Sequence, residues 1–303
     1  MQLTITAVSD PKQLEALGGS LDVFMAKCCE NPFYLSCFLQ RQMNHPAFAD
    51  GSTPMVLVSK VDGVIVGALP LLLTKKTGVQ SAEFLFKFYF SPDFVFDSKY
   101  RSASLSAFLD YIFNRLGCRF VIFDLPGDSQ DLEILTRLCD FNSVPVSIKN
   151  DACFEHAVLE VSSSWDEFQK SKSSNFRHRF KSIEKKLSKA GQWCVSCFED
   201  EADESGVLCR MMQVEASCWK QDWRQNNNLQ LDADLQNVWD GSSSAIKTCS
   251  GFKRYVWFLE LNGQPIAYSL VIQYKGTAYI AKTSFNNAYR RLYPGIYVVN
   301  AAI

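Results

Sequence analysis

The sequence lacks several features that mark secreted, membrane-spanning or nucleic-acid-binding proteins. Its amino terminus, MQLTITAVSD, has no basic stretch followed by an apolar one, so it does not resemble a secretory signal. The longest apolar run, VIVGALPLLL at 64–73, is too short to span a bilayer. Lysine and arginine together number 31 against 32 acids, and this net charge of −1 gives no global field that would select DNA. We therefore expect a cytoplasmic protein with no membrane span and no DNA partner.

Histidine is scarce, and the cysteines follow no metal-binding pattern. The only histidines are His45, His156 and His178, and the cysteines are scattered and odd in number, at 11. One CxxC pair, Cys194 and Cys197, lies in a segment that reads as a strand, where a spacing of three puts side chains on opposite faces. We expect buried, reduced thiols and no metal site.

What the sequence does have is an alternation of helix and strand patterns, which predicts an α/β protein with a mixed α+β sheet. The first half predicts helices at 12–28, 33–44, 102–116 and 129–140, and strands at 54–61, 64–74, 83–90, 119–125 and 144–149.

A hairpin signature occurs in both halves. Asp62-Gly63 and Asn262-Gly263 each lie between apolar strands, and such pairs favour the type I′ turn, which needs positive φ at both central residues. Apolar residues then alternate along 257–261 and 266–272, which predicts a half-buried antiparallel pair. We infer a duplicated unit with domains at 1–150 and 151–303. The second copy ends early against the first, so we expect it to be truncated by roughly forty residues.

Two helices carry candidate functional residues. At 173–191 an apolar stripe is surrounded by seven basic side chains, including Arg177, against one acid; this predicts either a solvated amphipathic helix or a surface for an anionic substrate, a phosphate or RNA. At 205–220 the apolar stripe contains Glu215, and burial there would raise the pKa of its carboxyl toward that of a general base. A structural Glu215 paired with a basic residue is the alternative, and Lys220 lies next to the same site.

The last stretch, AKTSFNNAYRRLYPGIYVVNAAI, predicts a strand, a basic turn and a helix. Alternation puts Ala278, Ile280, Lys282 and Ser284 on one strand face, where Lys282 interrupts an apolar pattern. After the turn, Pro294 suits the first helical position, and the following amides and the helix dipole favour an anion.

These segments together resemble the CelD-like acetyltransferases of the GNAT superfamily, which are bacterial relatives of the FemAB aminoacyl transferases. The likeness lies in four stretches: DGVIVGALPLL with SPDF, NFRHRFKSIEKKLSKAG, EASCWK, and NGQPIAYSL running into KTSFNNAYRRLYPG. It implies two tandem GNAT-like folds, of which the first, at 1–150, is non-catalytic and the second, at 151–303, is an incomplete acyltransferase domain.

The resemblance also implies acetyl-CoA or another acyl-CoA as co-substrate. Its pyrophosphate would lie on the turn made by Arg290, Arg291, Tyr293, Gly295 and Ile296, although proline replaces the first glycine of the usual GNAT turn. Glu215 and Lys282 are the candidate catalytic residues, and Arg177, Trp219 and Lys220 the candidate substrate-binding residues. The acceptor would be an amine, for example a sugar amine in envelope or exopolysaccharide synthesis. The alternatives are an aminoacyl-tRNA-dependent transferase, the one case with an RNA partner, and a non-catalytic GNAT-fold binding module.

Overall fold

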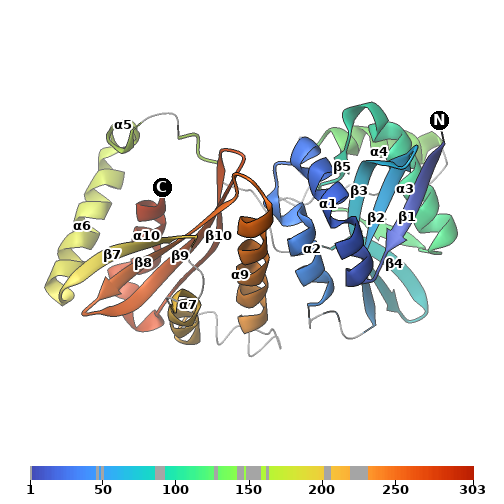
Figure 1. The fold of residues 1–303 in the computed structure, drawn as a ribbon. Helices are drawn as coiled ribbons and strands as arrows, with labels where there is room; N and C mark the ends of the chain where they lie inside the picture. The colour runs from blue at the N-terminus through green and yellow to red at the C-terminus, as the bar shows by residue number, and fades with distance from the viewer. Residues whose placement is uncertain are drawn as a thin grey trace. The chain divides into compact units, whose positions relative to one another are not determined.

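A computed structural model gives the structure of the chain. It describes residues 2–45, 48, 51–85, 93–125, 129–141, 147, 158–161, 164–200, 206–218 and 231–303. The chain divides into two compact units, Met1–His156 and Ala157–Ile303, which are described separately (Figure 1).

The first unit holds a mixed sheet. Its strands run in the order β1-β2-β3-β4-β6, with β5 beside β3; β4 and β6 are parallel and the other pairs are antiparallel. The elements are β1 (Leu3–Val8), α1 (Pro11–Cys28), η1 (Pro32–Tyr34), α2 (Ser36–Met43), β2 (Ser52–Val61), β3 (Val64–Lys76), β4 (Val79–Phe84), β5 (Val95–Phe96), η3 (Ser98–Tyr100), α3 (Arg101–Asp110), the π-helical turn η4 (Tyr111–Arg115), β6 (Phe120–Ile122) and α4 (Gln130–Phe141).

The second unit holds an antiparallel sheet in the order β10-β9-β8-β7, so β10 is an edge strand among the described residues. The elements are α5 (Trp165–Ser171), α6 (Ser174–Ala190), β7 (Trp193–Glu199), α7 (Val207–Ala216), α9 (Leu231–Thr248), β8 (Lys253–Leu261), β9 (Gln264–Tyr274), β10 (Thr277–Phe285), the 3₁₀ helix η6 (Asn287–Leu292) and α10 (Pro294–Ala302).

The two units repeat one another closely. Both follow the order strand, two helices, three antiparallel strands, helix, as in β1, α1, α2, β2, β3, β4, α3 and β7, α7, α9, β8, β9, β10, α10. Both hairpin turns have positive φ, at 50° and 84° for Asp62 and Gly63 and at 51° and 76° for Asn262 and Gly263. The strand pairing also slips at equivalent points, after Ser59 in the first unit and after Leu259 in the second. A shared turn and a shared bulge fix the same register in both units.

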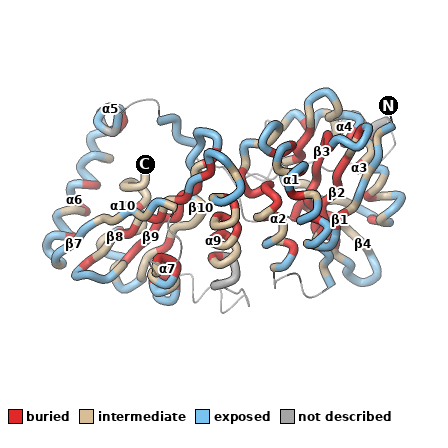
Figure 2. The backbone as a smooth tube through the Cα atoms, viewed as in Figure 1, coloured by how far each residue is buried: buried red, intermediate tan, exposed pale blue. Residues whose placement is uncertain are grey.

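Both faces of the central strands are buried, which corrects the expectation of a half-buried pair. Leu259 and Ala267 lie under α6 and α10, where Ile183, Leu187 and Val298 complete one apolar cluster. The neighbouring residues Phe258 and Tyr268 point to the other face and are also fully buried. Figure 2 colours most of β9 as buried. Helices on both faces explain why β8 and β9 read as nearly continuous apolar runs.

Some expected boundaries moved. The strand expected at 83–90 is β4, which runs over Val79–Phe84, and residues 86–92 lie outside the described part of the chain. The strand expected at 144–149 also lies outside it, except for residue 147. The helix expected at 173–191 is α6. Its N-cap is Ser173, whose side chain accepts a hydrogen bond from the Phe176 amide at 3.2 Å. It ends at Gly191, whose Cβ, if present, would lie 2.3 Å from the Asn262 side chain.

Candidate functional site

The expected donor turn begins where β10 ends. The 3₁₀ helix η6 carries Arg290 and Arg291, which are both exposed, and leads to Tyr293 in the left-handed conformation with φ 54°. Tyr293 is the N-cap of α10, and Pro294 opens the helix without donating an N–H. The amides of Gly295 and Ile296 then have no acceptor within the helix, and no side chain caps them. This end of α10 therefore presents two free donors and a positive dipole beside two arginines.

Gly295 is required by packing as well as by any ligand. A Cβ at this position would lie 2.9 Å from Cδ1 of Phe285, the last residue of β10. Two carbon atoms at that distance would overlap, so a larger residue would push the ring or the helix away. The glycine thus allows α10 to lie directly on the end of the strand.

An apolar cavity of about 720 Å³ begins at the same turn. Gly295 and Ile296 line it, and it continues between α10, β10 and the two helices α5 and α6. Its walls are mainly aromatic and aliphatic: Leu159, Phe168, Phe176, Phe180, Phe285, Val299 and Ile303, with Lys172, Thr283 and Asn300 as the polar members. A ligand with a phosphate at the start of α10 could extend an apolar or weakly polar arm into this space.

Glu215 is buried in a polar cluster on the other face of the sheet. Its side chain is 1% exposed. The Tyr268 hydroxyl of β9 donates to Glu215 Oε1, and the Cys218 thiol lies 3.4 Å from Oε2. Ser284 of β10 pairs with Tyr268 across the strands, and its Oγ is buried without a hydrogen-bond partner among the described residues. A tyrosine and a cysteine are thus partners of Glu215 among the described residues, and Lys220, the basic residue expected next to this site, lies outside them.

Lys282 lies on the same sheet face as Glu215, but Ala278 and Ile280 do not. The pairing of β10 slips between Ile280 and Lys282, so that Lys282 pairs with Leu270 and Ser284 with Tyr268. This bulge reverses the alternation that the sequence predicted for the whole strand. The cavity residues Thr283 and Phe285 point to the opposite face, so the two halves of the expected site meet across the edge strand β10.

Of the candidate substrate-binding residues, the structure describes only Arg177, which is bound to backbone carbonyls at the end of α5. One guanidinium nitrogen of Arg177 donates to the carbonyl oxygens of Gln169, Lys170 and Lys172, at 3.2, 3.2 and 2.6 Å. Arg177 therefore closes the carboxyl end of α5. Trp219 and Lys220 lie outside the described residues.

The described residues hold neither a cluster of metal-ligand side chains nor a membrane-spanning helix. Within them, no group of three or more His, Cys, Asp or Glu side chains is placed to hold a metal ion. No helix in the part of the chain that the structure covers is both long and apolar enough to cross a membrane.

The first unit has a place equivalent to the donor turn. The Asp97 amide donates to the Val66 carbonyl at 2.9 Å, as the Asn286 amide does to that of Ile266. Asp97 caps η3 as Asn286 caps η6. Because the two caps are equivalent, Arg101 corresponds to Arg290.

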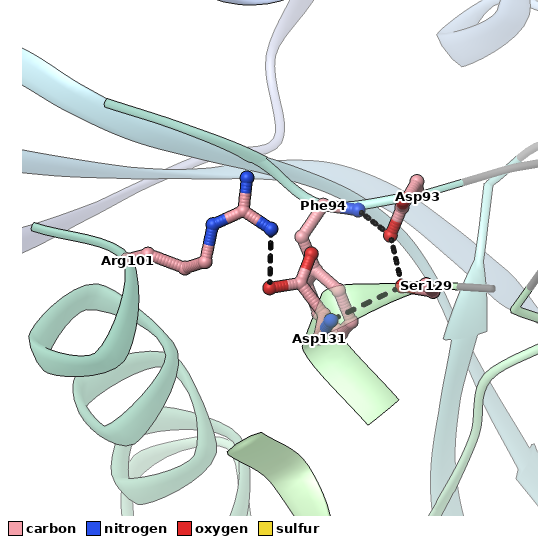
Figure 3. A network of polar contacts seen from close by, with 5 residues as sticks. All are labelled: Asp93, Phe94, Arg101, Ser129 and Asp131. Carbon is pink, nitrogen blue, oxygen red and sulfur yellow. Dashed lines mark hydrogen bonds and ion pairs between the residues drawn. The ribbon is translucent and has the colours of Figure 1, made fainter. Parts of the chain in front are cut away.

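A carboxylate of the unit itself lies against that arginine. Arg101 Nη1 donates to Asp131 Oδ1 at 3.2 Å (Figure 3). Asp131 is 1% exposed, and its Oδ2 has no hydrogen-bond partner among the described residues. The Ser129 hydroxyl donates to Asp93 Oδ1 at 3.3 Å and accepts from the Asp131 amide at 3.2 Å. Ser129 thus links the carboxyl group of Asp93 to Asp131, and Arg101 bonds the carboxylate of Asp131.

This cluster predicts a pH-dependent stability. Burial raises the pKa of Asp131 to about 6, against the opposing charge of Arg101, and the charge of Asp93 adds to the rise. The folded state then keeps a proton that the unfolded chain has lost between about pH 4 and 6, so the free energy of unfolding falls as pH rises through that window. Asp131→Asn should remove this fall, which amounts to roughly 1–2 kcal/mol, in urea unfolding at about pH 5 and pH 7.5.

Asp110→Asn provides the control for this prediction. Asp110 is an exposed aspartate of α3 that accepts from Asn114. This variant should keep the wild-type fall in stability. An Asp131→Asn protein with the same pH dependence as the wild type would contradict the assignment.

Sequence reasoning missed three residues near the expected site. Tyr268 falls within the alternating pattern of 266–272, and nothing in the sequence places it opposite Glu215. In the sequence, Arg179 and Lys186 are two of the seven basic residues of the helix at 173–191. In the structure, both lie over the ring of Tyr293, at 5.8 and 4.6 Å from its centroid. Their spacing of seven, which returns to one helix face, is the signal that could have separated them from the other basic residues.

Comparison with known proteins gives one family match. Residues 174–303 match the family model described as an acetyltransferase (GNAT) domain. A search of curated protein sequences finds no match.

The solved structures that match include three that cover 95% or more of this chain. FemX has a TM-score of 0.54 at 12% identity, over 100% of this chain and 85% of that one. A tandem GNAT protein from the clavulanic acid biosynthesis pathway has a TM-score of 0.43 at 12% identity, over 99% and 84% of the two chains. The C-terminal domain of a putative lysylphosphatidylglycerol synthetase from Agrobacterium fabrum has a TM-score of 0.47 at 12% identity, over 95% and 75%.

The likeness to FemX shows the fold and no more, because the identity is low. It extends over both units, each built in the same order of strands and helices. The expected fold class is thereby confirmed: the chain has a tandem GNAT-like α/β fold, and residues 174–303 of its second unit match the GNAT acetyltransferase domain.

Proposed function

We propose that the chain is an N-acyltransferase that moves an acyl group from acyl-CoA to an amine, with the donor bound by the second unit. One observation carries the proposal: the apolar cavity and the anion-favouring start of α10 share Gly295 and Ile296. A CoA thioester matches this arrangement, because it carries phosphates at one end and an uncharged arm at the other. The GNAT domain match over the same residues supports this choice of ligand.

The donor would be held by complementary charge and shape. The amides of Gly295 and Ile296 and the dipole of α10 would bind the pyrophosphate, with Arg290 and Arg291 adding charge. The pantetheine arm would run into the cavity beside Phe285 and along α10. The acyl group is proposed to be acetyl.

The chemical step is a direct transfer. The acceptor amine attacks the thioester carbonyl, the C–N bond forms, the C–S bond breaks, and the thiolate leaves as CoA. Backbone amides of β10, the edge strand among the described residues, would stabilise the oxyanion. The amine proton would pass to Glu215, with the Tyr268 hydroxyl as the link, and Lys282 would contact substrate on the same face.

The first unit is proposed to be non-catalytic. At the place equivalent to the donor turn, the carboxylate of Asp131 lies against Arg101 and would repel a phosphate. The acceptor is proposed to be a small molecule or saccharide, such as a sugar amine in envelope or exopolysaccharide synthesis, in line with the resemblance to CelD-like acetyltransferases.

Donor binding tests the proposal. Arg290→Ala/Arg291→Ala should weaken acetyl-CoA binding by about tenfold or more in calorimetric titration, because two cations beside the phosphates are lost. Lys181→Ala/Lys185→Ala removes the same charge from the exposed face of α6 and should bind as the wild type does. Equal affinities of all three proteins would contradict this donor site.

A second candidate is transfer from aminoacyl-tRNA, favoured by the FemX fold and by the basic face of α6. It predicts that the chain binds charged tRNA with an affinity that falls steeply with salt. A non-catalytic binding module is the third possibility, and acyl-CoA binding without turnover with any amine would identify it.

A further inference from the structure

Helix α6 lies outside the order of strands and helices that the two units share, since it precedes β7, the first strand of the second repeat. It is nevertheless firmly fixed to the repeat. Ile183 and Leu187 are buried against β8 and β9. The Tyr297 hydroxyl of α10 donates to Glu184 Oε1 at 3.1 Å. Burial and the neighbouring Glu184 raise the pKa of Tyr297 to about 12, so this hydroxyl keeps its proton at neutral pH.

This attachment brings two cations of α6 to the start of α10. Lys186 Nζ lies 4.6 Å from the ring centroid of Tyr293, and Arg179 Cζ lies 5.8 Å from it. Tyr293 is the N-cap residue of α10, and both cations are otherwise exposed. The ring thus holds the two charges next to the turn that carries Arg290 and Arg291.

In the part of the chain that the structure describes, no carboxylate forms an ion pair with the four cations Arg179, Lys186, Arg290 and Arg291. Glu184, the acid nearest in sequence, is engaged with Tyr297. Four positive charges gathered at one helix start are mutually repulsive, and an anionic ligand with several charges would relieve that repulsion.

We infer that Arg179 and Lys186, held on Tyr293, form a second phosphate subsite that takes the 3′-phosphate of the CoA nucleotide. This rests on the proposed function, and it narrows the donor class. A pyrophosphate carries two negative charges and a terminal phosphate adds nearly two more, which together balance the four cations. The donor is therefore a free CoA ester, because a phosphopantetheine arm without the nucleotide would leave Arg179 and Lys186 unused.

The test compares CoA with 3′-dephospho-CoA, which differs only by this phosphate. The wild type should bind CoA about tenfold more tightly in calorimetric titration. Arg179→Ala/Lys186→Ala should lose that preference by weakening CoA binding while leaving the affinity for dephospho-CoA unchanged. If the two residues had only a structural role, the variant would bind both CoA and dephospho-CoA more weakly. Both residues are exposed, so the variant should fold, and circular dichroism checks this.

The control removes two lysines from another face of the same helix. Lys181 and Lys185 are exposed and lie on the side of α6 away from its buried stripe of Phe180, Ile183 and Leu187. Lys181→Ala/Lys185→Ala should keep the wild-type preference for CoA.

The two proposals can fail separately. Equal binding of CoA and dephospho-CoA by the wild type, or a preference that survives in Arg179→Ala/Lys186→Ala, would overturn the subsite and leave the acyl-CoA donor intact. If the wild type bound neither CoA nor dephospho-CoA, both proposals would be overturned.

Discussion

Glu215→Gln is expected to lower the turnover number by about 100-fold while leaving the affinity for acetyl-CoA unchanged. The reason is that the amide keeps the size of the carboxylate and can still accept from Tyr268 at Oε1, but it cannot take a proton. Glu215 lies on the opposite face of the sheet from the cavity, so donor binding should not depend on its charge. Steady-state kinetics with an amine acceptor, together with calorimetric titration of acetyl-CoA, measure the two effects.

The matched control is Glu199→Gln. Glu199 is half exposed at the end of β7, where it pairs with Lys253 and is not part of the proposed site. Its variant should turn over as the wild type does. A Glu215→Gln protein with unchanged turnover and a lowered melting temperature would instead make Glu215 a structural link between α7 and β9.

Arg254→Met is expected to lower the free energy of unfolding of the second unit by about 2–4 kcal/mol. Arg254 is buried, and its Nη1 donates to the Trp239 carbonyl at 3.1 Å and to the hydroxyls of Ser242 and Ser243 at 2.9 and 2.7 Å. Its guanidinium also lies 3.5 Å from the centroid of the Trp239 ring. Methionine would fill most of the volume but would leave these acceptors of α9 without their donor.

Hydrogen exchange of the β8 and α9 amides measures this loss within the second unit alone. The control is Lys253→Met, which removes a neighbouring cation whose ion pair with Glu199 is solvent-exposed. Surface pairs of this kind contribute little, so that variant should stay within about 0.5 kcal/mol of the wild type. Exchange rates in Arg254→Met equal to those of Lys253→Met would show that the buried arginine does not stabilise the contact between α9 and β8.

The sequence alone determined the α/β class, the repeated hairpin and the helix with the basic surface. These rest on local chemistry. Asn-Gly and Asp-Gly specify the turn, because they adopt positive φ at little cost, and an apolar stripe of period 3.6 specifies the buried face of α6. The same local signals placed Pro294 at the first position of α10.

Tertiary structure alone decided which residues share a site. The bulge before Lys282 puts that side chain on the sheet face that Glu215 contacts, and no residue pattern within the strand predicts the bulge. Tyr268 becomes a partner of Glu215 only because α7 packs on β9, and Arg179 and Lys186 reach Tyr293 only because α6 packs beside α10. In each case the residues are more than 50 positions apart in the chain, where sequence periodicity carries no information about contact. Periodicity reports which face of an element is buried, and packing decides what that face meets.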